Sequence, residues 1–375
     1  MSAPRAFTYL IQMNERNASD LYLTVGHEPA VRVEDELFSI DSEKLTPEQV
    51  NEIIHSILTT KQRRDYELHW ELNTSLDLGK HGRFRVNILR QRQNPGLVIR
   101  RIVSKIPTIK DLKLSPILEP LALEKRGLIL LTGMTGSGKT TTLASMINYR
   151  NERKTGHILT IEDPIEYYHD HKKSVVTQRE IGVDTESYHI ALKNSLRQRP
   201  DVILIGEIRD REVMEQALSA SETGHLCLAT LHTNNAYQAI ERIVNFFPED
   251  QHNQVRMNLS MNLKAIISQR LLPSRSGGLV PAQEIMLNEA LIRELIMKGQ
   301  YEKITEVMEQ NRAIGMQTFD QALLDLFKEN LISEETVLNQ SDKASDMKVK
   351  LQAIKLGKGE SSLSSLDTSL LSVSD

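Results

Sequence analysis

The sequence predicts an α/β protein in which a small α+β domain precedes a parallel sheet covered by helices. One observation is that apolar runs alternate with helical segments from Arg126 onward, which is typical of parallel strands joined by helices. These strand-like runs span residues 128–132, 158–161, 202–205 and 226–231. The other observation is that several strand-like runs with few helices come before them. A length of 375 residues is enough for two such domains.

Shifts in composition divide the chain into four parts. Residues 1–105 form the predicted α+β domain, and residues 106–120, with several prolines, form a linker that we call the connector. Residues 121–340 carry the sheet and the C-terminal helices. Residues 341–375 shift to lysine, serine and glycine without an aromatic residue, which predicts a disordered tail whose leucines leave room for a short docking helix.

Local patterns predict individual elements. Thr46, Pro47 and Gln49 are typical of a helix start, because threonine caps, proline fits the first turn and glutamine reaches back. Residues 20–25, 83–88 and 97–103 are strand-like. After Phe247 we expect mostly helix. The apolar stripe behind this expectation consists of Val255, Leu259, Leu263, Ile266 and Ile267.

Charge and cysteine content exclude some classes of function. The formal net charge is −4, which argues against a sequence-independent nucleic-acid binder. Cys227 is the single cysteine, so an internal disulfide and a CxxC-type zinc site are excluded. The N-terminus lacks the apolar segment of a secretory signal, and no apolar run is long enough for a spanning helix. We therefore expect a cytoplasmic protein that does not insert into a membrane.

Residues 133–140, which we call the P-loop, match the phosphate-binding pattern G-x-x-x-x-G-K-[ST]. Its glycines let successive backbone N–H groups point at a phosphate, and the following helix adds its dipole. Lys139 is predicted to reach the β- and γ-phosphates of ATP, and the Thr140 hydroxyl to bind Mg²⁺. The predicted nucleotide-binding residues are Gly133, Met134, Thr135, Gly136, Ser137, Gly138, Lys139, Thr140 and Thr141.

Acidic residues and a histidine follow the other predicted strands, where ligands of open parallel sheets bind. Glu162 and Asp163 follow one strand, Glu207 the next and His232 the last. Glu207 is predicted to orient or deprotonate the attacking water. Gly206 stands where an aspartate is usual, so Mg²⁺ would depend on Thr140, water and either Glu162 or Asp163. The alternative for each acidic residue is a structural position in a loop.

His225 and His232 flank the last predicted strand. Seven residues at about 3.3 Å each place them about 23 Å apart on opposite faces, so they cannot share a metal ion. His232 lies at the nucleotide end and is a candidate sensor of the γ-phosphate. His225 lies at the far end, where a structural or interface role competes with a functional one.

Arginines crowd the strands before the connector. They are Arg83, Arg85, Arg90, Arg92, Arg100 and Arg101. A solvated face is one explanation. The other is an arginine supplied across a subunit boundary to stabilise charge on the transferring phosphoryl group.

Four segments together resemble the secretion ATPase superfamily. The P-loop, residues 160–166 (TIEDPIE), 201–210 (DVILIGEIRD) and 224–233 resemble its Walker A, Asp box, Walker B and His box in that order. Residues 18–21 and 83–87 resemble the PAS-like N-terminal domain of the type IV pilus retraction ATPases, the PilT/PilU group. The resemblance covers about residues 5–335 and implies a RecA-like core behind a PAS-like domain.

The resemblance also implies an assembly and a task. It implies a homohexameric ring that hydrolyses ATP to drive pilus retraction and twitching motility, peripheral to the inner membrane through a pilus platform protein and without nucleic acid. Arg83, Arg85 and Arg100 match family arginines that reach a neighbouring subunit's nucleotide, and Arg209 follows Walker B. The family's Walker B also keeps only the glutamate, as Glu207 does here.

Within the family, retraction is favoured over assembly, because assembly-type relatives carry a tetracysteine zinc site and a further N-terminal domain. Arg199 and the serine-rich tail depart from the PilT pattern and favour the accessory PilU branch, which implies a mixed assembly with PilT as one option. Two other classes stay open at this point: a RecA-like nucleic-acid motor, and a regulatory module that binds ATP without turning it over.

Overall fold

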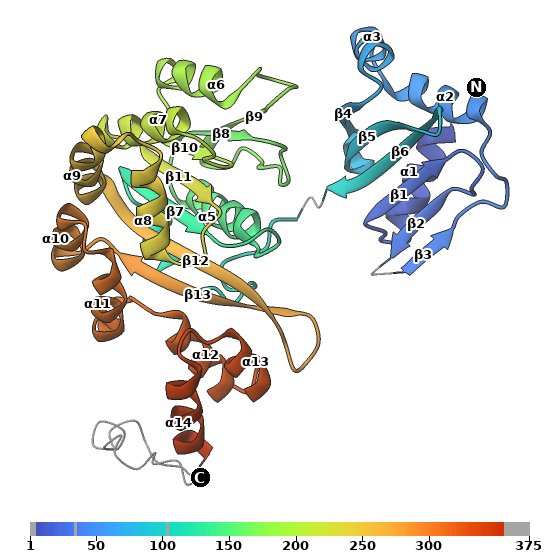
Figure 1. The fold of residues 1–375 in the computed structure, drawn as a ribbon. Helices are drawn as coiled ribbons and strands as arrows, with labels where there is room; N and C mark the ends of the chain where they lie inside the picture. The colour runs from blue at the N-terminus through green and yellow to red at the C-terminus, as the bar shows by residue number, and fades with distance from the viewer. Residues whose placement is uncertain (1–4, 34–35, 103–104, 356–375) are drawn as a thin grey trace. The chain divides into compact units, whose positions relative to one another are not determined.

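The computed structural model describes residues 5–33, 36–102 and 105–355, and the chain forms two compact units (Figure 1). The first unit contains Met1–Ile106 and Glu166–Tyr168, and the second contains Pro107–Ile165 and His169–Asp375. In the described residues, no helix combines the length and the apolar character that crossing a membrane requires.

The first unit is an α+β domain built on an antiparallel six-stranded sheet. The strand order is β3-β2-β1-β6-β5-β4. The strands are β1 (Asp20–Thr24), β2 (Ala30–Val33), β3 (Glu36–Ser39), β4 (Leu72–Asp77), β5 (Arg83–Gln91) and β6 (Asn94–Ile102). The helices are α1 (Arg5–Glu15), α2 (Pro47–Ile57) and α3 (Thr60–His69). The predicted start of α2 is confirmed: Thr46 caps it and Gln49 completes a capping box.

Strand alternation places Arg83, Arg85 and Arg100 on one face of the sheet in this unit. Phe84, Val86 and Ile88 of β5 are fully buried in the domain core. Side chains alternate along a strand, so Arg83 and Arg85 point to the opposite face. Arg85 pairs directly with Arg100 of β6, so the three predicted arginines share that face.

The second unit is built on a seven-stranded sheet in the order β13-β12-β7-β11-β10-β8-β9. Its strands are β7 (Gly127–Thr132), β8 (Gly156–Glu162), β9 (Ser174–Glu180), β10 (Val202–Ile205), β11 (Leu226–Leu231), β12 (Leu263–Pro273) and β13 (Leu279–Leu287). All neighbouring strands are parallel except β12 and β13. Every residue of β7, β10 and β11 is buried, as expected for strands covered on both faces. The predicted α/β fold class is confirmed.

Helices cover both faces of this sheet (Figure 1). They are α4 (Leu118–Ala122), α5 (Lys139–Arg153), α6 (Tyr188–Ser195), α7 (Arg211–Glu222), α8 (Ala236–Asn245) and α9 (His252–Asn262). Helix α4 packs with α5, whereas α6, α7, α9 and α8 pack in succession. The chain moves along the sheet in opposite directions through these two groups. Right-handed crossovers therefore place them on opposite faces.

The connector is not a bare linker. Ile109, Leu114 and Leu118 are buried in the main core of the second unit, and the last of these begins α4. The backbone N–H of Ser115 donates to Gln283 Oε1 at 2.9 Å. Most of the connector is therefore part of the packed structure of the second unit.

The structure corrects the helical prediction after Phe247. Helix α9 ends at Asn262, and β12 begins at the next residue. Leu263, Ile266 and Ile267 therefore belong to a buried strand and do not continue the helical stripe. A short apolar run fits both the helical and the strand spacing, so spacing alone could not distinguish the two. Gly277 and Gly278, both with positive φ, turn the chain from β12 into β13.

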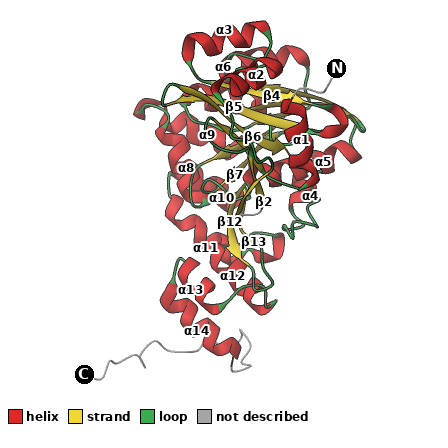
Figure 2. Cartoon of the chain, turned by 90° about the vertical axis from the view of Figure 1, so that its right-hand side faces the viewer, coloured by secondary structure: helices red, strands yellow, loops and turns green. Residues whose placement is uncertain are grey.

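The helices after β13 are α10 (Ala290–Lys298), α11 (Ile304–Gln310), α12 (Phe319–Lys328), α13 (Glu334–Gln340) and α14 (Ala344–Lys355). Helices α10 and α11 pack in the main core of the second unit. Helices α12, α13 and α14, which Figure 2 shows together, form a separate small core at the end of the β12–β13 hairpin. Met347 and Leu351 of α14 are buried there, so the predicted disorder from residue 341 is wrong for α14. The composition missed it because few apolar residues are needed to bury one face of a short helix. Residues 356–375, with the suggested docking helix, lie outside the described residues.

Candidate nucleotide-binding and catalytic site

The P-loop, His232, Glu207 and Glu162 lie side by side along one edge of the parallel sheet. The strands that precede them, β7, β11, β10 and β8, are consecutive neighbours in the sheet. Registers pair Leu231 with Thr132 and Ile205 with Ile161, so the strands end nearly level. The edge therefore presents, in order, the P-loop, His232, Glu207 and Glu162.

The P-loop glycines are required by conformation and by space. Gly133, Gly136 and Gly138 have φ values of 146°, 79° and 83°, which L side chains rarely adopt. A Cβ at Gly133 would lie 2.4 Å from the carbonyl oxygen of Gln269, and one at Gly138 would lie 2.8 Å from its Nε2. Gln269 on β12 therefore forms the floor against which the loop packs.

Lys139 is buried and donates to the carbonyl oxygens of Gly133 and Met134, at 2.7 and 2.9 Å. The side chain thus lies across the loop at the start of α5, whose N-terminus favours an anion. Thr140 and Thr141 occupy the same first turn. Ser137 Oγ and Thr132 Oγ1 are buried and have no protein hydrogen-bond partner in the described part of the chain. These hydroxyls can serve ligand oxygens.

The donors at this edge suit Mg²⁺. Magnesium prefers oxygen ligands and is usually bound through one or two protein groups together with substrate phosphates and water. The Thr140 hydroxyl and the carboxylates of Glu207 and Asp163 are such oxygens. Among the described residues, no cluster of three or more His, Cys, Asp or Glu side chains could hold a metal ion by itself. Magnesium would here supply charge neutralisation at the phosphates.

Glu207 is held by two partners at the sheet edge. One carboxylate oxygen lies 2.8 Å from Arg209 Nε, and the other lies 3.1 Å from His232 Nε2. Arg209 also lies 3.7 Å from Asp163. The bond to Glu207 raises the pKa of Arg209. Sequence reasoning noted Arg209 without a contact, and the structure makes it a direct partner of the predicted catalytic glutamate.

The two histidines of the His box are separated as the strand geometry predicted. Burial, then the nearby Lys139, lowers the pKa of His232, so its ring is neutral at neutral pH and can donate to Glu207. His225 lies at the other end of β11, where its Nδ1 is 3.1 Å from the Ala220 carbonyl oxygen. Its contacts are those of a residue that joins α7 to the strand.

Glu162 is buried at the end of β8 and is fixed by two side chains. Thr160 Oγ1 donates to it at 2.7 Å, and Gln178 Nε2 donates at 3.3 Å. Asp163 is exposed and directed towards Arg209. The two acidic residues therefore differ: one is an immobilised carboxylate, and the other belongs to the charged group around Glu207.

Tyr188 is a site residue that sequence reasoning missed. Burial, then the charge of Asp163, raises its pKa, with Glu162 and Glu207 acting in the same direction. A Cβ at Gly206 would lie 2.8 Å from its hydroxyl oxygen and 3.3 Å from Glu162 Cα. The tyrosine thus occupies the space that an aspartate side chain would need. Packing explains the unusual glycine before Glu207, although a lone tyrosine gave no signal in the sequence.

Glu284 is a second missed residue. It lies on β13, is buried, and accepts from the Ala236 backbone N–H at 2.7 Å and from Ser268 Oγ at 3.1 Å. Burial raises its pKa to about 7. It thereby anchors the start of α8, the helix that follows His232.

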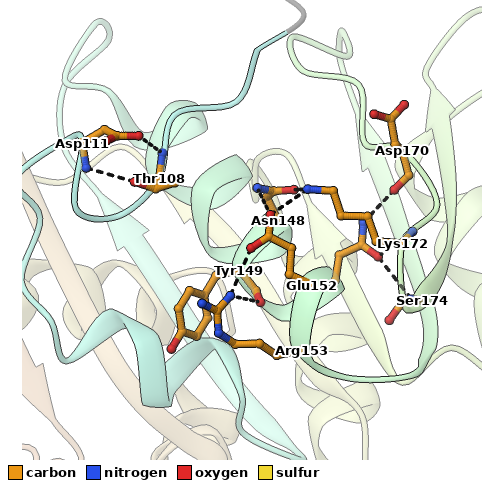
Figure 3. Close-up of polar contacts among 10 residues, drawn as sticks. Thr108, Asp111, Asn148, Tyr149, Glu152, Arg153, Asp170, Lys172 and Ser174 are labelled. Carbon is orange, nitrogen blue, oxygen red and sulfur yellow. Dashed lines mark hydrogen bonds and ion pairs between the residues drawn. The ribbon is translucent and has the colours of Figure 1, made fainter.

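The far end of the P-loop helix holds the loop that follows the Asp box. Asn151 is fully buried; its amide donates to the Asp170 carbonyl oxygen and accepts from the backbone N–H of Ser174. Lys172 Nζ joins Asn148 and Glu152 of α5 at 2.8 and 2.7 Å, as Figure 3 shows. Helix α5 therefore links the P-loop at one end to the chain between β8 and β9 at the other.

Two of the predicted arginines of the first unit, Arg83 and Arg100, are held by acidic neighbours. Arg83 lies 2.7 Å from Asp77, and Arg100 lies 2.8 Å from Asp20. The Arg100 side chain remains 67% exposed, so its pairing leaves it open to solvent. Arg85 faces Arg100 across the strand pair.

Comparison with known proteins identifies the family. Residues 13–329 match the family described as "Type II/IV secretion system protein". The chain belongs to this family. It is 49% identical to the type IV pilus ATPase PilU of Pseudomonas aeruginosa, over 92% of this chain and 90% of that protein. It is 42% identical to the retraction ATPase PilT of the same organism, over 86% and 93%. A crystal structure of the pilus retraction motor PilT with bound ADP superimposes with a TM-score of 0.85 at 44% identity, over 89% of this chain and 96% of that one.

These comparisons confirm the predicted resemblance. The chain is an ATPase of the PilT/PilU group, and its identity to PilU exceeds its identity to PilT. The relative of known structure binds ADP, which agrees with a nucleotide site in the chain. The retraction group is favoured over the assembly-type ATPases and over a nucleic-acid motor.

Proposed function

We propose that this secretion ATPase is the motor of type IV pilus retraction, with the properties of the PilU branch. The observation that carries the proposal is the ordered edge of P-loop, His232, Glu207 and Glu162 in a chain that is 49% identical to PilU over 92% of its length. Such an edge combines phosphate binding with a base for water, the two requirements of ATP hydrolysis.

The residues divide the chemistry between them. The P-loop amides and Lys139 bind the phosphates, and Thr140 contributes to Mg²⁺ binding. Glu207 orients the attacking water, and His232 holds Glu207 and responds to the γ-phosphate. Glu162, fixed by Thr160 and Gln178, completes the negative edge.

The catalytic unit is proposed to be a homohexameric ring with an arginine acting between subunits. Arg83, Arg85 and Arg100 share one face of the first unit. Arg100 is exposed to solvent, whereas Arg83 and Arg85 are partly buried. An arginine that stabilises the transition-state charge is worth about 10³–10⁵ in rate. Whether this arginine acts on the nucleotide of a neighbouring subunit can be tested by mixing two inactive variants.

The mixing experiment combines Glu207→Gln subunits with Arg100→Ala subunits. Each variant alone is expected to be nearly inactive. Mixed rings would contain some interfaces with both residues intact, so phosphate release should recover part of the wild-type rate. Absence of recovery for Arg100, and likewise for Arg83 and Arg85, would contradict an arginine acting in trans.

The proposed setting is the cytoplasmic face of the inner membrane, bound to the pilus platform protein, with a mixed assembly with PilT as one form. The test is loss of the gene in a piliated strain, with and without PilT present. We expect fibres that assemble but retract less, and a defect that the wild-type gene restores and Lys139→Ala does not. Normal retraction in both backgrounds would contradict the proposal.

A further inference from the structure

We propose that Gln269 positions the P-loop and forms, with Gln283, a buried relay that transmits the occupancy of the loop to the connector at Ser115. The inference rests on nucleotide binding at the P-loop, as proposed above. It assigns Gln269 as a positioning residue, because its side-chain amide holds the Ser137 carbonyl oxygen of the loop.

The relay is a continuous chain of short hydrogen bonds. Gln269 Nε2 donates to the Ser137 carbonyl oxygen of the P-loop at 2.7 Å. Gln283 Nε2 donates to Gln269 Oε1 at 3.0 Å. The Ser115 backbone N–H donates to Gln283 Oε1 at 2.9 Å. The two glutamines are 2% and 4% exposed, so water does not compete for these bonds.

The direction of each bond requires the amide groups. Gln269 Oε1 accepts a second bond, from Thr142 Oγ1 of α5 at 2.9 Å. Its oxygen therefore serves two donors, and its nitrogen serves the P-loop carbonyl. Glutamate cannot donate, and an apolar residue can do neither, so replacement leaves buried polar groups without partners.

Steric contact makes the relay sensitive to the loop. Gly133 and Gly138 leave no space above Gln269, since a Cβ at either position would come within 2.4 or 2.8 Å of it. Lys139 now donates to Gly133 and Met134, and it must leave these carbonyls to reach the β- and γ-phosphates. Any resulting shift of the loop presses on Gln269 directly. Gln283 then carries the displacement to Ser115.

The connector end of the relay is equally well held. Ser115 lies between Leu114 and the buried Leu118, which pack in the main core. Its amide exchange therefore reports the Gln283 bond. In the sequence, the connector joins the first unit to β7, the first strand of the seven-stranded sheet. The relay therefore ends at a segment through which the nucleotide state can affect the link between the two units.

The experiment is amide hydrogen exchange of the full-length protein with and without ADP. In the wild type, ADP is expected to slow exchange at Ser115 by about five-fold or more, because opening of a bonded amide becomes rarer. Gln283→Met keeps the volume but removes the relay. It should bind ADP within about three-fold of wild type and lose the response at Ser115.

Gln269→Met should also weaken ADP binding by about ten-fold, because the Ser137 carbonyl oxygen is left buried without its donor. Gln317→Met is the matched control. Gln317 Nε2 donates to the backbone oxygen of Gln283 at 3.1 Å and lies outside the relay, so its loss should leave the Ser115 response intact.

The outcomes separate this inference from the proposed function. An unchanged Ser115 response in Gln283→Met, or wild-type ADP affinity in Gln269→Met, would overturn the relay while leaving the ATPase assignment standing. A wild-type protein that binds ADP without any change at Ser115 would overturn the transmission. A wild-type protein that does not bind ADP, or a Lys139→Ala variant that binds it equally well, would instead remove the nucleotide site and the relay with it.

Discussion

The two halves of the nucleotide site are held by different kinds of interaction. The P-loop rests on Gln269, which is 2% exposed and uncharged. Glu207 is held by Arg209, whose side chain is 59% exposed. Breaking a buried hydrogen bond costs about 1–3 kcal/mol, whereas an exposed ion pair contributes about 0–1 kcal/mol. The binding half is therefore held more firmly than the reacting half, which can rearrange at little cost.

Glu207→Gln tests the reacting half most severely. The amide cannot take a proton from water, so phosphate release should fall by about 10²–10⁴. ADP affinity should stay within about three-fold, because the P-loop is unchanged. Steady-state phosphate release and titration with fluorescent ADP measure the two effects. Glu222→Gln, an exposed change at the end of α7, is the control. Retention of half the wild-type rate by Glu207→Gln would exclude its assigned role.

Gly206→Ala tests whether packing sets the position of Glu207. The Cβ of the alanine would lie 2.8 Å from the Tyr188 hydroxyl oxygen, so the chain at the end of β10 must shift. Displacement of the Glu207 carboxylate from its position should lower kcat by about ten-fold. Tyr188→Phe removes that oxygen. The double variant should therefore recover most of the loss. If the double variant is as slow as Gly206→Ala, the contact with Tyr188 is not the cause.

Glu284 extends the comparison to titration of a buried group. Its folded-state pKa of about 7 lies above the ordinary value of 4.5, so folding favours the protonated carboxyl. Its contribution to stability is complete below pH 4.5 and is lost as the pH rises through about 7. Between pH 6 and pH 8 the free energy of unfolding should fall by about 1 kcal/mol from this group. Urea denaturation of wild type and Glu284→Gln at both pH values measures it, and an equal fall in both proteins would contradict the assignment.

Arg209→Ala should have the smallest effect on stability. Arg209 and Asp163 are exposed and Glu207 is partly exposed, so the free energy of unfolding should change by about 0.5 kcal/mol or less. Urea denaturation at pH 7.5 measures it, with Arg211→Ala, another exposed pair, as a matched control. A loss of about 2 kcal/mol or more would show that the reacting half is as firmly held as the P-loop.

Prediction from sequence succeeded where local pattern and function coincide. The strands β10 and β11 were predicted with their observed limits, because continuous apolar runs ended by polar residues have few alternatives. The residues after these strands, Glu207 and His232, then followed from sheet topology alone. Their contact at 3.1 Å is what a shared edge implies.

Prediction from sequence failed where the structure of a segment depends on contacts with residues far away in the sequence. Leu263 and Ile266 fit a helical stripe as well as a strand, and pairing with β7 decides between the two. Gly277 and Gly278, between two apolar runs, were the available hairpin signal. Tyr188 carries no motif, because its place beside Gly206 exists only after β8 and β10 pair.

The floor beneath the P-loop has a consequence for how the protein is made. Gln269 lies 132 positions after Ser137, the loop residue whose carbonyl it binds. During synthesis the phosphate-binding sequence emerges first and stays without its floor until β12 has left the ribosome and paired with β7. A nascent chain that ends before residue 269 has the motif but not the site. Nucleotide binding can therefore mark a chain whose ATPase core is complete.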